Sequence, residues 1–156
     1  MLPLPYTKLI HEKLSTVLTF AYSWAALQDM LDNRFVGEWK YLRKTVDGIG
    51  PENAIRAFIE LAAYLRLLDD SEHLSGYLAT EGTEKSFGRV RKNDGKEETL
   101  YLRDLTNKIV HAKDWKWDVS DRDRPKLICV SNDPDRWLAA EIEIQAFAAF
   151  CGQLMH

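Results

Sequence analysis

The segment Leu100-Tyr-Leu-Arg-Asp-Leu-Thr-Asn-Lys-Ile-Val-His-Ala-Lys-Asp-Trp-Lys-Trp-Asp-Val119 changes its hydrophobic period near its middle. Up to Ala112, apolar residues recur three and four positions apart, which is typical of an amphipathic helix. From Trp115 onward, apolar and polar residues alternate, which is typical of a strand buried on one face. The segment therefore predicts a helix that ends where an antiparallel sheet begins.

Two further runs with strand character follow this segment. The first covers 127–130 and comes after the turn sequence at 120–125, and the second covers 137–144 and comes after the turn sequence at 132–135. Three consecutive runs of this kind, separated by turn residues, predict a small three-stranded antiparallel meander within residues 115–144, near the C-terminus.

Helical periodicity extends over three other segments, 7–32, 52–70 and 145–155. Segment 52–70 is apolar almost all round, so we expect it to be the central and most buried helix. With a helix at 97–112, these segments make a bundle of about four helices. Helices followed by a run of strands predict a helix-dominated α+β fold, and a length of 156 residues predicts a single globular domain over 1–156.

The charge of the chain is unevenly distributed. A formal net charge of −3 argues against a protein that coats nucleic acid without specificity. Segment 84–96, directly before the predicted helix, carries five cations and two carboxylates, a net charge of +3 by five minus two. A solvated loop is one interpretation of this segment. A nucleic-acid-binding patch is the other, and its candidate residues are Arg89, Arg91, Lys92 and Lys96.

The sequence also predicts where the protein works and which groups it does without. Charges interrupt the N-terminal stretch where a signal peptide needs an apolar run, and no apolar run approaches the ~20 residues that span a bilayer. We therefore expect a cytoplasmic protein without membrane contact. Cys129 and Cys151 are too few for a disulfide framework or a zinc site, and there is no glycine-rich phosphate loop. We expect neither a metal nor a cofactor.

Arg103, Asn107 and His111 are spaced four residues apart and form one polar stripe on the predicted helix. An imidazole exchanges protons near neutral pH, so His111 is a candidate general acid or base. Arg103 could stabilise the charge of a phosphorane, and Asn107 could orient the imidazole or the phosphate. The three are candidate catalytic residues for RNA cleavage without a metal. Alternatively, the stripe is a solvated face and His111 caps the helix end near the last carbonyls.

The pattern Asn107-x3-His111, in a helix-rich domain of this length, resembles the HEPN superfamily. Active members carry an arginine directly before the polar residue, and Thr106 stands at that position here. Arg103 lies one turn earlier, on the same side as Asn107, and is the candidate replacement. The resemblance implies a helical bundle and a homodimer, with the three stripe residues lining a groove between the subunits.

Two classes of function follow. The first is a bacterial-type HEPN-like protein without catalysis, which dimerises or binds a protein partner. The second is a metal-independent endoribonuclease or RNA-binding protein of the toxin or defence type, which uses the Arg103, Asn107 and His111 stripe. The absence of arginine at Thr106 and the negative net charge favour the first class, and the stripe with its basic neighbour favours the second. A homodimer is expected in either case, because Val110 adds an apolar contact surface to the helix.

Overall fold

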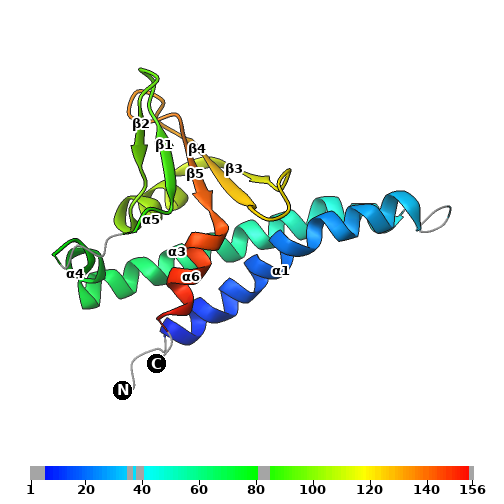
Figure 1. The fold of residues 1–156 in the computed structure, drawn as a ribbon, viewed down its shortest axis with the longest axis horizontal. Helices are drawn as coiled ribbons and strands as arrows, with labels where there is room; N and C mark the ends of the chain where they lie inside the picture. Colours follow the sequence, from blue (N-terminus) through cyan, green and yellow to red (C-terminus); the bar gives the residue numbers. More distant parts are fainter. Residues whose placement is uncertain (1–5, 35–36, 38–40, 81–84, 155–156) are drawn as a thin grey trace.

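The computed structural model describes residues 6–34, 37, 41–80 and 85–154. Its first element is α1 (Tyr6–Asn33). A second helical run comprises α2 (Leu42–Lys44), a π-helical turn η2 (Thr45–Ile49) and α3 (Gly50–Glu72). Figure 1 shows α1 and α3 lying side by side and antiparallel along the length of the molecule. The predicted helices at 7–32 and 52–70 correspond to α1 and α3.

α1 and α3 join through apolar side chains at helical spacing. Ile10, Leu14 and Val17 of α1 belong to the same buried cluster as Phe58 and Leu61 of α3. Segment 52–70, expected to be the central and most buried helix, packs against both α1 and α5 (Leu102–Val110) but is not enclosed on every side. Its outer face is open, and Leu67 on that face keeps 47% of its surface exposed.

The sheet has five antiparallel strands in the order β2-β1-β5-β4-β3. Three of them form the predicted meander, β3 (Ala112–Asp118), β4 (Lys126–Ser131) and β5 (Ala139–Glu143). The sheet is larger than the predicted meander, because a hairpin of β1 (Gly88–Arg91) and β2 (Glu97–Thr99) pairs with β5. The helix predicted over 97–112 is correspondingly wrong at 97–99, which is β2, and the observed helix α5 (Leu102–Val110) is shorter.

The sheet stands on the α1–α3 pair, and α6 (Ile144–Gly152) runs from the end of β5 across both helices (Figure 1). One face of the sheet closes the core with Val90, Leu127 and Ile142. Between the layers, the rings of Phe58 and Phe147 stack with their centroids 5.0 Å apart. The helix predicted over 145–155 is α6, and a short helix α4 (Leu74–Thr80) follows α3.

Two further properties bear on the class of protein. In the described part of the chain, no helix is long and apolar enough to cross a membrane. Cys129 and Cys151 are buried and unpaired, and burial raises the pKa of the Cys129 thiol to about 12. Cys129 is therefore held as a thiol inside the core, where it behaves as a small apolar residue.

Candidate functional site

The stripe helix α5 packs against α3 through one apolar side. Leu102, Leu105, Thr106 and Ile109 are buried, so the remaining residues of the helix face outward. His111 is the residue that ends α5, and its backbone N–H donates to the carbonyl of Asn107 at 3.0 Å. The indole N–H of Trp115 donates to the carbonyl of Ile109 at 3.0 Å. The exposed imidazole of His111 makes no hydrogen bond to any described residue, so its predicted cap on the last carbonyls is not seen.

A groove of about 810 Å³ opens at this end of α5. Three elements line it: the outer side of α5, the end of β1, and the loop between β4 and β5. The lining side chains are mostly polar, with one aromatic ring in the floor: Lys92, Asp104, Asn107, Lys108, His111, Asn132, Asp133, Arg136 and Trp137. The groove thus contains two of the three predicted stripe residues, Asn107 and His111, and one of the predicted basic residues, Lys92.

The cations of the groove differ in how firmly they are held. Lys108 is engaged, because its Nζ lies 3.2 Å from a carboxylate oxygen of Asp104 and 4.8 Å from the centroid of the Trp137 ring. The Nζ of Lys92 lies 3.4 Å from a carboxylate oxygen of Glu98, a residue outside the groove. Arg136 is exposed and makes no ion pair with any described residue. Arg136 and Lys92 are therefore the cations that a ligand can recruit at the lowest cost.

The β4–β5 loop is ordered by its own hydrogen bonds and by contacts with β1. The Ser131 hydroxyl accepts the N–H of Asp133 at 2.9 Å, and the N–H of Arg136 donates to the Asp133 carbonyl at 3.0 Å. The side chain of Asn93, in the β1–β2 turn, donates to the Asp135 carbonyl at 3.3 Å. Arg136 thus lies on a turn that hydrogen bonds already hold in place, and its backbone needs no reordering when a ligand binds.

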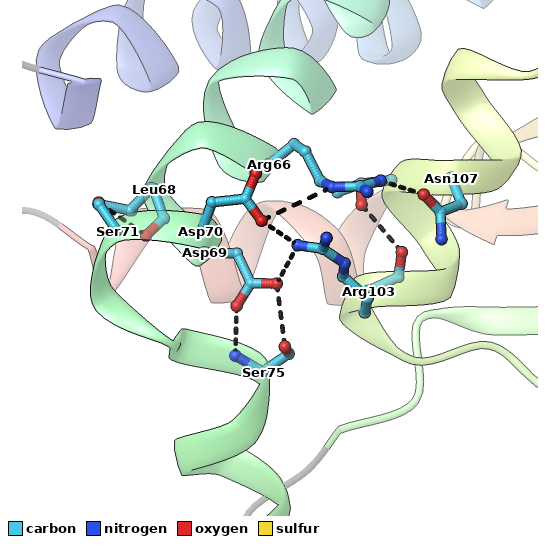
Figure 2. Close-up of polar contacts among 9 residues, drawn as sticks. Arg66, Leu68, Asp69, Asp70, Ser71, Ser75, Arg103 and Asn107 are labelled. Carbon is cyan, nitrogen blue, oxygen red and sulfur yellow. Dashed lines mark hydrogen bonds and ion pairs between the residues drawn. The ribbon is translucent and has the colours of Figure 1, made fainter.

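Arg103 lies outside the groove, in a cluster of ion pairs at the end of α3 (Figure 2). Its Nη1 donates to Asp69 at 3.0 Å and to Asp70 at 2.6 Å. Asp69 is 4% exposed and also accepts the backbone N–H and the hydroxyl of Ser75, at 2.6 and 2.9 Å. Burial alone would raise the pKa of Asp69, but the hydrogen bonds from Ser75 and Arg103 outweigh it and lower that pKa below its ordinary value.

The guanidinium that reaches Asn107 is Arg66, from α3. Its Nη1 donates to Asn107 Oδ1, and its Nε lies 3.9 Å from Asp70 (Figure 2). Sequence reasoning missed Arg66 because its partner is 41 residues away along the chain. The available signal was a cation interrupting the otherwise apolar segment 52–70.

Thr106, at the position where the resemblance expects arginine, is 1% exposed and faces the core. Its hydroxyl donates to the carbonyl of Arg103 at 2.9 Å, so the side chain is satisfied within its own helix. An arginine at this position could not reach the groove without disrupting the core packing. The stripe is thereby divided, with Asn107 and His111 at the groove and Arg103 in the ion-pair cluster.

The predicted basic patch is divided as well. Arg89 and Arg91 are exposed and alternate with the buried Val90, so they lie on the open face of the sheet, opposite the groove. Arg89 Nη1 lies 3.2 Å from a carboxylate oxygen of Glu97. The Nζ of Lys96 lies 3.9 Å from a carboxylate oxygen of Asp94 in the hairpin turn. Only Lys92 of the four residues lines the groove.

Chemically, the groove offers hydrogen-bond donors and cations around one imidazole, which suits an anionic ligand. In the described part of the chain, no group of His, Cys, Asp and Glu side chains is arranged to hold a metal ion. No protein family, curated protein or solved structure matches the chain in the three comparisons with known proteins. The site is therefore interpreted from its own geometry.

Proposed function

We propose that this chain is a HEPN-like protein that binds RNA in the α5 groove without cleaving it. One observation carries the proposal: the groove gathers Lys92, Asn107, His111 and Arg136, whereas Arg103 is held in the ion-pair cluster. The proposal thus takes the RNA-binding alternative of the sequence analysis without its catalysis.

The groove suits the backbone of a single strand. A phosphodiester carries one negative charge, and Lys92 at the end of β1 and Arg136 in the β4–β5 loop supply recruitable cations. The amide of Asn107 and the imidazole of His111 add donors from α5. Asp133 also lines the groove and offsets part of the positive charge, so the affinity rests on a few placed contacts rather than on a broad positive field.

Binding without cleavage follows from the placement of the charged groups. Cleavage without a metal needs a base for the 2′-hydroxyl, an acid for the leaving 5′-oxygen and a cation at the phosphorus. Among the groove residues, His111 is the one side chain whose type exchanges protons near neutral pH. The stripe arginine that would complete such a site is engaged by two carboxylates.

The test measures binding of a fluorescent single-stranded RNA by anisotropy over a range of salt concentrations. Replacing Lys92 and Arg136 together by Ala should weaken binding and reduce the slope of log K against log salt by about 1.4, or about 0.7 for each lost phosphate contact. The matched control replaces Arg89 and Arg91 by Ala. It removes the same charge from the opposite face of the sheet.

The control variant should retain the affinity and the salt slope of the wild type. Equal losses in both double variants would mean that RNA is attracted by the charge of the whole surface, and would rule out the groove as the binding site. Absence of RNA binding by the wild type at low salt would overturn the proposal altogether.

An endoribonuclease is the second candidate, favoured by the exposed imidazole of His111 in the same groove as the unpaired guanidinium of Arg136. In that mechanism His111 takes the proton of the 2′-hydroxyl, which attacks the phosphorus, while Arg136 stabilises the phosphorane. The bond to the 5′-oxygen then breaks, and His111 returns its proton to that oxygen, leaving a 2′,3′-cyclic phosphate and a free 5′-hydroxyl. Incubation of mixed RNA with the wild type in EDTA distinguishes the two. Intact RNA supports binding alone, and cleavage that His111→Ala abolishes establishes the nuclease.

A further inference from the structure

The contact between Arg66 and Asn107 fixes which way round the Asn107 amide lies. A guanidinium has only donors, so the amide group that faces Arg66 Nη1 must be the oxygen. The amide nitrogen then lies on the side away from Arg66, as Figure 2 shows. Asn107 also lines the groove, so the N–H2 group is the part of this amide that is left for a ligand.

Arg66 is itself held in place from its other side. Its Nε lies 3.9 Å from Asp70, and the same Asp70 oxygen accepts Arg103 Nη1 at 2.6 Å. The Arg66 Nε is buried and has no hydrogen-bond partner among the described residues. A buried donor without a partner is costly. The Arg66 side chain is therefore held in this position by the contacts of its other guanidinium atoms, above all the bond from Nη1 to Asn107.

We propose that Arg66 is a positioning residue for the groove: it locks the Asn107 amide as a hydrogen-bond donor and thereby selects an acceptor on the ligand, such as a phosphate oxygen. This inference rests on the proposed RNA binding and adds a specificity to it. With Asn107 locked, a ligand that presents a donor at this point, such as a base amino group, finds no acceptor on the amide.

The first test replaces Arg66 by Met, which keeps the length of the side chain and removes its donors. The amide is then free to turn over, and RNA affinity should fall roughly three- to tenfold. Arg66→Lys retains a charged donor and should recover most of the affinity. The matched control is Arg56→Met, which removes one positive charge from an exposed position on the same helix and should leave affinity unchanged.

A double-mutant cycle separates positioning from a direct or purely structural role. If Arg66 acts through Asn107, Arg66→Met should change affinity by less than about twofold once Asn107 is already Ala. Additive losses would mean that Arg66 contacts the RNA itself and would overturn the inference. Thermal unfolding of each variant, measured alongside, identifies any loss of affinity that only reflects a loss of folded protein.

Asn107→Asp gives an independent readout. The carboxylate would still accept Arg66 with one oxygen but would present the other to the ligand as a negative charge. Its affinity should be lower than that of Asn107→Ala, and an equal or higher affinity would overturn the inference. Failure of the wild type to bind RNA removes the proposed function, whereas wild-type binding that Arg66→Met leaves unchanged removes this inference alone.

Discussion

Asp69 is the residue at which α3, α4 and α5 are joined. Its carboxylate accepts the N–H of Ser75 at the start of α4, and it also accepts Arg103 from α5. An oxygen that accepts a backbone N–H in the first turn of a helix acts as a cap for that helix. The acidic end of α3 is therefore stabilised by its neighbours, which offsets the unfavourable placement of negative charge at a helix C-terminus.

Asp69→Asn should lower the free energy of unfolding by about 1–3 kcal/mol at neutral pH, because it removes the charge that Ser75 and Arg103 stabilise. Since the native pKa of Asp69 is lowered, its contribution is complete above the unfolded pKa of about 3.9 and is lost as the pH falls through the native value. The difference between wild type and variant should therefore shrink in acid. Urea unfolding at about pH 7 and below about pH 3 measures both values.

The exposed Asp135 provides the control, and Asp135→Asn should change the free energy of unfolding by less than about 0.5 kcal/mol. A difference between wild type and Asp69→Asn that stays constant down to the acid limit would contradict the assignment of the stability to the ionised carboxylate.

Among the elements, β1 depends on a glycine. Gly88 has a φ of +146°, and a Cβ added there would lie 1.8 Å from the carbonyl oxygen of Glu141 in β5. This close approach is what lets the β1–β2 hairpin pair with the meander and become part of one sheet. Lys92, at the end of β1, reaches the groove only because this pairing holds the hairpin in place.

Gly88→Ala should destabilise the protein by more than about 2 kcal/mol, because the added methyl group must push β1 and β5 apart in a backbone conformation that already disfavours a side chain. Gly152→Ala is the matched control, since an added Cβ meets nothing within 4 Å at that position. Thermal and urea unfolding report the difference. A Gly88→Ala protein as stable as the control would show that the strands can separate at little cost.

The sequence predicts an element well where that element carries a strong local pattern of apolar residues. The long helices and the meander carry clear periods of 3.6 and two, because each buries one continuous face. β2 carries no such period, since Glu97, Glu98 and Thr99 are all exposed. The helix predicted over 97–112 therefore includes residues 97–99, which form a strand only because they pair with β1.

The site was less predictable than the fold for the same physical reason. Asn107 and His111 follow from spacing on one helix, and both line the groove. The partner of each arginine depends on tertiary contacts: Arg103 binds carboxylates 33 and 34 residues away, and Arg66 reaches Asn107 across 41 residues. Arg136 belongs to a loop whose position depends on β1, so no local pattern places it beside α5.

At the scale of the whole molecule, large apolar side chains on α3 and α5 remain exposed. Leu67 on α3 and Val110 on α5 keep 47% and 45% of their surfaces exposed, and Tyr101, directly before α5, keeps 40%. Leu67 follows Arg66 directly, and Val110 lies one helical turn after Asn107. An apolar surface at this place suits an isologous dimer, in which the same side of both copies would meet about a two-fold axis.

We therefore propose a homodimer formed through this side, and we expect a sedimenting species of twice the 18.0 kDa chain mass. Replacing Leu67 and Val110 together by Asp should yield monomers, because each buried charge would oppose its counterpart across the axis. Ile49→Asp, 53% exposed on η2, is the control for a charge on an apolar surface residue and should leave the dimer intact. Analytical ultracentrifugation of the wild type decides the question, since a monomer at tens of micromolar would exclude both the dimer and a groove shared between its subunits.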